Sequence, residues 1–356
     1  MKQLSFKRFT IYFDQYLFIS ITLLSVMGLF FLYSASQGDV NVVIKQAVFV
    51  GFGLCLMFAL SQPDPDIYKI LSLIFLIVSL LLVVITILFA KEINGAKRWL
   101  DLGVFTLQPS ELVKIALPLY LASYLFEKPI PINLKNTFKS IAIIVICFLL
   151  IAEQPDLGTS LVVSMAGVYI LFFAGLSWKF IGSSFLIFII SLPFLWNNFL
   201  QPFQQQRIQT LLDPGADPYG SGWNIMQSKI AIGSGGISGK GYTDGSQSHL
   251  DFLPETETDF IFAVIAEEFG FIGICFLLSI YFFILLRCLY LAFNARDRFC
   301  RLTIGGLSLI FASTLFINLA MLTGLIPVVG MPLPLISKGG SSLLSFYIAF
   351  GIIISM

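Results

Sequence analysis

Long runs of apolar residues restrict the fold of this sequence more than any other feature. Such runs extend from Ile67 to Ala90, from Ile141 to Ile151 and from Phe260 to Phe293, with short polar stretches between them. A run of about 20 apolar residues matches the roughly 30 Å hydrocarbon core of a bilayer. Hydrophobic residues make up 57% of the chain and charged residues only 12%, which is too little polar surface for a water-soluble domain. The sequence therefore predicts an all-α polytopic membrane protein.

The apolar runs predict about ten transmembrane helices in a single membrane domain that covers residues 1–356. Lys and Arg cluster in alternate loops, and this bias assigns those loops and the N-terminus to the cytoplasm. The opposite loops then face outward, and the only large one covers residues 199–258. Its interleaved apolar residues favour an ordered loop on the membrane surface. The expected spans lie near residues 14–36, 43–61, 67–90, 109–126, 139–154, 158–176, 180–198, 259–293, 302–325 and 339–356.

Composition argues against several classes of function. His249 is the only histidine, which argues against a His-rich metal site or a Ser-His-Asp hydrolase. The five cysteines are widely spaced and lack the pairing typical of metal or redox chemistry. A net charge of +1 argues against a nucleic-acid partner. The glycine stretch before Lys240 is not a Walker loop, because its required first glycine falls on Ser234, so no nucleotide is expected.

Glu111 and Lys114 are charged residues at the start of an expected span. A charged side chain at membrane depth costs several kcal/mol, so it needs a partner, a wet cavity or a function. The two residues lie three apart and therefore share a helix face, where they can pair. Pro109 and Glu111 also fit a simple helix start. Because a cation near a helix N-terminus is disfavoured, capping does not explain Lys114, and we predict a site-organising role for the pair.

Further acids are expected on the same membrane side. Glu153 and Asp156 flank an outer turn between two spans, and we group them with the site-organising residues. Asp259 begins the span that follows the large loop. By sequence alone it fits a helix cap, since helix starts favour oxygen-bearing side chains, as well as it fits a catalytic carboxylate. Glu267 is expected about 80° round that helix and on the order of 12 Å deeper, where it or Glu268 lines an internal cavity.

Cations gather on this side too. Residues 235–241 and 338–341 combine lysine with glycines whose backbone N–H groups are able to approach an anion, although glycine stretches also form simple turns. The cationic set comprises Lys97, Arg98, Arg207, Lys229, Lys240 and Lys338.

Five motifs, in one order along nearly the whole chain, resemble those of the SEDS (shape, elongation, division, sporulation) family of membrane proteins. Their common order argues against chance agreement. Residues 227–236 and 245–247 resemble the elongation branch, and the division branch is the alternative. The five motifs occupy residues 94–99, 108–111, 154–160, 253–262 and 330–342.

The resemblance implies a peptidoglycan glycosyltransferase that polymerises lipid II during cell-wall elongation. A sugar 4-hydroxyl of one lipid II attacks the anomeric carbon that ends another chain, and undecaprenyl pyrophosphate leaves. Asp259, at the position of the family's essential aspartate, either accepts the hydroxyl proton or holds a divalent cation, Mg²⁺ or Mn²⁺. The predicted contacts of pyrophosphate and substrate are Lys97, Arg98, Trp99, Lys240, Lys338 and Ser341.

One position departs from the family pattern. Relatives often carry a basic or imidazole side chain where this chain has Glu257. We expect this negative charge to raise the pKa of the neighbouring Asp259.

The resemblance also implies partners and a location. The expected partners are a class B penicillin-binding protein, which is a transpeptidase, and other membrane proteins of the elongation complex, and the expected location is the bacterial inner membrane. A lipid II flippase is an alternative function. A flippase needs a polar path across the whole bilayer, whereas a polymerase needs a reactive carboxylate at the outer surface. The expected interior charges lie in the outer half, which favours the enzyme.

Overall fold

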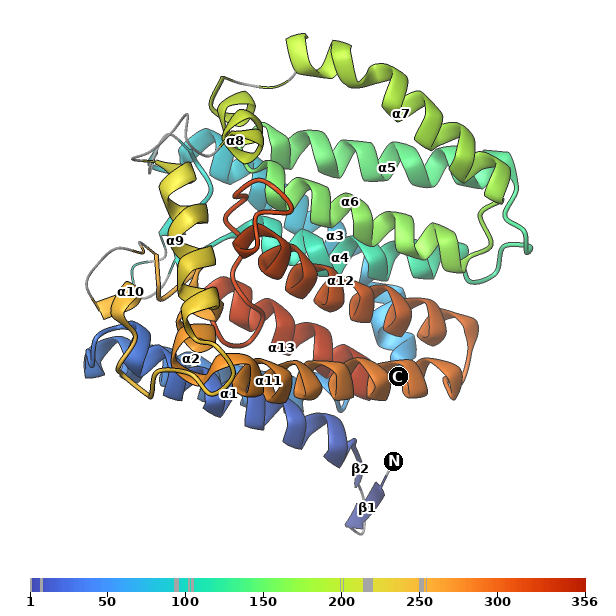
Figure 1. Ribbon diagram of the computed structural model, residues 1–356. Coiled ribbons are helices and arrows are strands. Elements are labelled where there is room, and N and C mark those ends of the chain that lie inside the picture. The colour runs from blue at the N-terminus through green and yellow to red at the C-terminus, as the bar shows by residue number, and fades with distance from the viewer. Residues whose placement is uncertain are drawn as a thin grey trace.

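Helices account for most of this computed structural model (Figure 1). It describes residues 2–6, 9–92, 96–101, 103, 106–198, 200, 202–213, 220–249, 253 and 255–356. Asn94, Gly95 and Pro254 of the sequence motifs lie outside the described residues.

A helix lies at each of the positions where the sequence predicts a span. Aspartates begin several of them: Asp14 accepts a hydrogen bond from Leu17 N at 2.9 Å, and Asp297 accepts one from Cys300 N at 2.8 Å, as expected for N-cap residues. The helices are α1 (Gln15–Ala35), α2 (Val40–Leu60), α3 (Pro65–Phe89), α4 (Pro109–Leu125), α5 (Leu134–Ala152), α6 (Leu157–Phe173), α7 (Trp178–Asn198), α11 (Ile261–Phe293), α12 (Arg298–Leu322) and α13 (Gly340–Ser355).

Within the described residues, six of these helices are long and apolar enough to cross a membrane, namely α1, α2, α3, α5, α11 and α12. The helices α6 and α13 are apolar but shorter. The all-α membrane class is confirmed, whereas the count of ten spans stays a prediction.

The core lies where α11, α12 and α13 meet α4. Phe311 of α12 is buried, and its ring centroid lies 5.6 Å from that of Tyr281, 5.6 Å from that of Phe346 and 5.1 Å from that of Phe350. Large apolar side chains on the outside of the bundle, such as Phe89 at the end of α3, are exposed. An apolar exterior around an apolar core is what a bilayer requires.

The segment expected as one large loop contains helices. These are α8 (Pro202–Leu212), α9 (Ser221–Ser234) and the short α10 (Ser246–His249). They lie together at one end of the bundle, on the left in Figure 1, which we call the α8–α10 end. The α9 helix packs on α12, where Ser228 Oγ donates to Leu322 O at 2.9 Å. The short strands β3 (Leu100–Asp101) and β4 (Thr106–Leu107) pair between α3 and α4, and β1 (Lys2–Phe6) pairs with β2 (Phe9–Phe13) before α1.

The helix α11 is kinked rather than straight. Gly270 has φ 62° and ψ −162°, a conformation that requires glycine. The chain after α9 packs into this break: Phe271 N donates to Gly236 O at 2.9 Å, and Lys240 N donates to Glu267 O at 3.0 Å. Asp259 lies in the turn before α11, so the helical relation expected between Asp259 and Glu267 is wrong.

Candidate functional site

The predicted pair of Glu111 and Lys114 forms at the start of α4. Lys114 Nζ lies 2.5 Å from Glu111 Oε2, and both side chains are buried, with relative exposures of 3% and 7%. Ser345 Oγ of α13 also donates to Glu111 Oε2 at 2.7 Å, and the ammonium group lies 4.5 Å from the ring centroid of Phe346. The pair therefore joins α4 to α13, which suits an organising role.

Asp259 lies in the turn of residues 256–260 at the α8–α10 end. The N-cap of α11 is Phe260, and it has no side-chain hydrogen bond, so Asp259 does not cap this helix. Asn318 Nδ2 of α12 donates to Asp259 O at 2.9 Å and to Met331 O at 2.7 Å, which fixes the turn. A Cβ atom built on Gly330 lies 3.5 Å from Asp259 Oδ2, so the carboxylate faces the chain between α12 and α13.

Burial raises the pKa of Asp259 to about 6. The negative charge of Glu255 adds to this rise, and the positive charge of Arg207 opposes it. Glu257, which the sequence suggested as the neighbour that raises this pKa, instead forms an ion pair with Lys338. The expectation is corrected: the turn places the carboxylate of Glu255, not that of Glu257, in the position that acts on Asp259.

Arg98 and Asp156 meet at the turn between α5 and α6. Arg98 Nε donates to Gln154 O at 3.2 Å, and its Nη2 donates to Pro155 O. Asp156 caps α6 through Thr159 N at 3.2 Å and accepts from Gln108 Nε2 at 2.9 Å. Asp156 therefore joins the start of α6 to the residue before α4.

The remaining residues of this region take different places. The exposed Lys97 and Glu153 line a cavity of about 190 Å³ together with Glu92. Trp99 is half-buried directly before β3. Ser341 is buried, donates to Thr106 O at 2.8 Å and accepts from Gln108 N at 3.1 Å, so it ties α13 to the chain before α4.

Lys240 and Lys338 are held by carboxylates. Lys240 Nζ lies 2.6 Å from Oε1 of the fully buried Glu267, which also accepts from Ser246 Oγ at 3.0 Å. Lys338 pairs with Glu257. The glycine stretches beside the two lysines form turns, because the N–H groups of Gly241 and Lys338 donate to protein carbonyl oxygens rather than pointing into an open cradle. Both lysines therefore fasten loops.

Sequence reasoning included Arg207 among the cations but did not name it as a site residue. It lies on α8, and its Nη1 donates to Val328 O at 2.9 Å. Burial and the positive charge of Arg98 lower the pKa of Arg207, while Asp259 and Asp156 raise it. The charges of Arg207 and of Asp259, the candidate catalytic residue, therefore act on each other. The available sequence signal was that Arg207 is the only arginine in residues 199–258.

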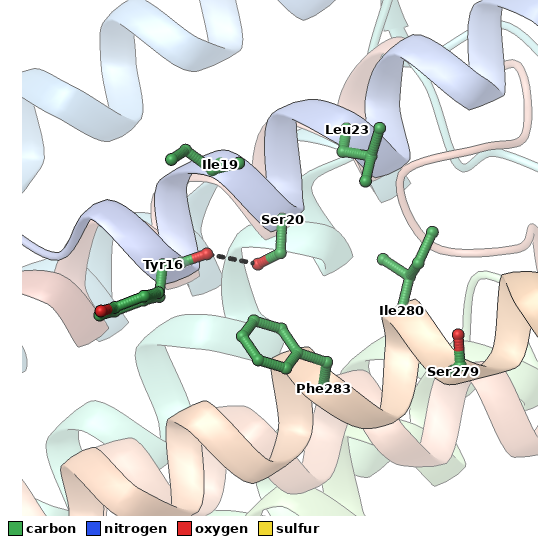
Figure 2. Close-up of a pocket in the computed structure, with 7 residues that line it drawn as sticks. All are labelled: Tyr16, Ile19, Ser20, Leu23, Ser279, Ile280 and Phe283. Carbon is green, nitrogen blue, oxygen red and sulfur yellow. Dashed lines mark hydrogen bonds between the residues drawn. The ribbon is translucent and has the colours of Figure 1, made fainter.

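A larger cavity, of about 410 Å³, lies between α1 and α11 (Figure 2). Ile280 and Phe283 of α11 point toward α1 there, and Ser20 donates to Tyr16 O at 2.9 Å. None of the described residues that line this cavity carries a carboxylate. On α11 its lining begins at Ser279, nine residues beyond the kink at Gly270 and about 14 Å along a helix, so the cavity is separate from the Asp259 site.

No three of the described His, Cys, Asp and Glu residues gather into a site for a metal ion. The acids that act on each other here are Asp259 and Glu255, since the charge of Glu255 raises the pKa of Asp259. The arrangement at the α8–α10 end thus combines one carboxylate of raised pKa with nearby guanidinium groups. Chemically, it is able to remove a proton beside a bound anion.

Known proteins match this sequence over nearly its whole length. Residues 14–356 match the family model described as the cell cycle proteins FtsW, RodA and SpoVE. The chain is 42% identical over 346 residues to the peptidoglycan glycosyltransferase MrdB of Escherichia coli K12, covering 97% of this chain and 94% of that one.

Two solved structures are similar throughout. One chain, from a study of polymerization and crosslinking by a peptidoglycan synthase complex, has a TM-score of 0.84 at 30% identity and covers 96% of this chain and 97% of its own. The rod shape determining protein RodA of Thermus thermophilus has a TM-score of 0.73 at 29% identity and covers 96% and 95%. With these matches and its apolar helices, the chain is a multi-pass membrane protein that belongs to the FtsW/RodA/SpoVE family, the SEDS family.

Proposed function

We propose that this protein is a peptidoglycan glycosyltransferase that polymerises lipid II into glycan strands during cell-wall elongation. The 42% identity to a peptidoglycan glycosyltransferase over nearly the full length of both chains supports the reaction class. The observation that carries the proposal is the carboxylate of Asp259, which lies beside the start of α11 without capping it and has a pKa raised to about 6.

The reaction requires a base and cations. Asp259 accepts the proton of the attacking 4-hydroxyl while the new C–O bond forms at the anomeric carbon of the other chain. The bond from that carbon to the diphosphate breaks, and its electron pair stays on the departing oxygen. A carboxylate with a pKa of about 6 is mostly ionised at neutral pH and is more basic than an ordinary aspartate. Nearby cations stabilise the charge on the leaving group.

A divalent cation is part of this proposal. Mg²⁺ is commonly bound by one or two carboxylates together with substrate phosphates and water, and Asp259 with Glu255 offers such a pair. The cation supplies charge neutralisation of the diphosphate when it is bound.

The proposed location is the bacterial inner membrane, with the N-terminus in the cytoplasm. The distribution of Lys and Arg in alternate loops supports this orientation, and it makes the α8–α10 end face outward. The proposed partner is a class B penicillin-binding protein that cross-links the new strands. The similarity to a chain from a peptidoglycan synthase complex supports a partner of this kind.

The test is to reconstitute the purified protein in liposomes with lipid II and Mg²⁺, with and without the partner. We expect long glycan strands on a gel and release of undecaprenyl pyrophosphate. Transfer of lipid II between leaflets without any polymer would replace the enzyme by a transporter.

A further inference from the structure

Three consecutive carbonyl oxygens of the turn that carries Asp259 accept hydrogen bonds from one part of the chain. The donors lie in α12 and in the residues directly before α13. The three bonds run from Lys338 N to Glu257 O at 2.8 Å, from Ser337 Oγ to Thr258 O, and from Asn318 Nδ2 to Asp259 O at 2.9 Å. The turn is therefore docked along its backbone onto this part of the bundle.

The helix that follows the turn does not provide these bonds. The N-cap of α11 is Phe260, and Ala263 N in the first turn of the helix donates to Phe260 O at 2.9 Å. The carbonyl oxygens of the three residues before Phe260 bond to donors outside α11. The direction of the turn, and with it that of the Asp259 side chain, is thus set by α12 and by the residues before α13.

Asn318 joins this turn to the chain that the carboxylate faces. Its side chain is fully buried in α12, and Nδ2 donates both to Asp259 O at 2.9 Å and to Met331 O at 2.7 Å. Both hydrogens of the amide nitrogen are used in these bonds. A Cβ atom built on Gly330, the residue before Met331, lies 3.5 Å from Asp259 Oδ2. One side chain therefore fixes the Asp259 backbone against the segment beside its carboxylate.

The two carbonyl oxygens also explain why this residue is an asparagine. A flipped amide would place Oδ1 against both of them, which is repulsive. In the observed orientation, Oδ1 is buried and none of the described residues donates a hydrogen bond to it. A buried acceptor without a donor is unfavourable, and a leucine has nearly the same shape without this cost. Asn318 is therefore explained by what it binds in the turn rather than by the stability of α12.

Ser337 holds the neighbouring residue of the turn. Its side chain is buried, and Oγ donates to Thr258 O and accepts from Leu333 N at 2.8 Å. The loop that carries this serine is fastened to α2, because Gln46 Nε2 donates to Ser337 O at 3.1 Å. The hydroxyl group thus links a loop held by α2 to the residue directly before Asp259.

We propose that Asn318 and Ser337 are positioning residues of the polymerisation reaction, which hold two carbonyl oxygens of the turn and so aim the carboxylate of Asp259 at the attacking hydroxyl. This inference rests on the proposed function and deepens it, because it names residues that set the geometry of the base. Neither side chain contacts the substrate or exchanges a proton with it. A displacement of about 1 Å in a reacting group is able to lower a rate about a hundredfold. Loss of these bonds should therefore reduce kcat more than it weakens binding of lipid II.

The first test compares two variants of Asn318 in lipid II polymerisation by the purified full-length protein. Asn318→Leu keeps the shape of the side chain and removes its donors, so kcat should fall by about tenfold to a hundredfold while KM changes by less than about twofold. Asn318→Gln keeps the N–H donors on a longer side chain and should retain more activity. If Asn318 only filled space, the order would reverse, because glutamine overfills the site. Activity of Asn318→Leu equal to or above that of Asn318→Gln would overturn the proposal.

The matched control for these variants is Thr314→Val. Thr314 is buried one turn earlier in α12, and its Oγ1 donates to Ile310 O of the same helix at 2.9 Å. The substitution removes a buried polar group from α12 at similar shape without touching the turn. It should keep the wild-type kcat, and a loss as large as that of Asn318→Leu would attribute the effect to α12 as a whole and contradict the proposal.

A second variant decides the question if Asn318→Leu fails to fold. Ser337→Ala removes the bond to Thr258 O and should lower kcat several-fold. Its control is Ser79→Ala, at a buried serine that donates to Phe75 O within α3, which should keep the wild-type kcat. Wild-type kcat in Ser337→Ala would refute the positioning role of this serine.

Hydrogen exchange followed by mass spectrometry shows whether the turn itself has moved. A peptide that covers residues 255–260 should exchange several-fold faster in Asn318→Leu and in Ser337→Ala than in the wild type, while a peptide from the middle of α3 should not change. A variant that loses activity with unchanged exchange in residues 255–260 would contradict the proposed cause.

The two proposals fail separately. If the wild type makes no polymer from lipid II, the proposed function is wrong, and the exchange data still decide whether the two side chains hold the Asp259 turn. If the wild type makes polymer and both variants do so at the wild-type rate, this inference alone is wrong.

Discussion

At the scale of single residues, the pKa of Asp259 determines how activity depends on pH. Asp259 works as a base only when it is ionised, and burial raises its pKa to about 6. The kcat/KM for lipid II should therefore be level above this pH and fall as the pH drops through about 6, because the proton then occupies the base. A pH–rate profile of the purified protein checks this. A profile that stays flat down to pH 4 would exclude Asp259 as the base.

Glu255 offers a sharper version of this test. Its negative charge raises the pKa of Asp259, so Glu255→Gln should lower that pKa and move the acidic limb of the profile to lower pH. The control is Glu127→Gln, which removes an exposed carboxylate near the opposite end of α4 and should leave the limb in place. Movement of the limb to higher pH, or the same movement in both variants, would contradict the account.

The sequence identified Asp259 because a motif placed it there, but it could not decide between cap and base. That choice depends on the residue at which α11 begins, and the helix begins two residues later than the motif suggested. Glu255 was missed for the same reason. Which acid of the turn acts on Asp259 depends on the turn geometry and on Lys338. This lysine pairs with Glu257, from which it is separated by 81 residues in the sequence.

At the scale of helices, the buried pair of Glu111 and Lys114 should stabilise the contact of α4 with α13. Glu111→Gln leaves the buried ammonium group of Lys114 without its charge partner, and breaking a buried pair in this way costs about 3–5 kcal/mol. The double variant Glu111→Gln with Lys114→Met should recover most of the lost stability, since no unpaired charge remains. Thermal unfolding in detergent measures both. Equal stability of the single variant and the wild type would show that the pair is not needed.

The packing of the C-terminal end of α9 against α11 should be disrupted by a single added methyl group. Gly235→Ala puts a Cβ atom 2.0 Å from Ala266 O of α11, so α9 and the following turn must shift. We expect faster proteolysis of residues 235–249 and a several-fold loss of polymerisation. Gly233→Ala is the matched control, because it lies two residues earlier in open space and replaces a helical glycine by the best helix former. Equal proteolysis of the two variants would contradict the packing.

Two residues that are three apart on one helix lie on the same face. The contact between Glu111 and Lys114 was therefore predictable from their spacing alone. The kink at Gly270 was not, because a glycine inside an apolar run does not by itself indicate a break. The partners that stabilise this kink come from the chain after α9, some 30 residues earlier. The helical relation expected between Asp259 and Glu267 failed because α11 begins only at Ile261. The cavity expected at Glu267 or Glu268 stays a prediction.

At the scale of the whole molecule, apolar runs were enough to place the ten helices at the expected spans and to identify a membrane protein. The α8 helix was not predicted, because it is short and polar. Arg207 was recognised as a cation on this side, but its contact with Val328 depends on the segment that α12 and α13 bring to it. The charges of the site thus come from elements spread over most of the chain, and only the folded bundle brings them together at the α8–α10 end.

Polymerisation of lipid II by Asp259→Asn tests the central claim most directly. The variant keeps the size of the side chain and removes the base, so the initial rate should fall by about a hundredfold to ten-thousandfold, while Asp244→Asn, at an exposed position of the same segment, should keep the wild-type rate. If Asp259→Asn made polymer as fast as the wild type in this assay, the carboxylate would not take part in the reaction.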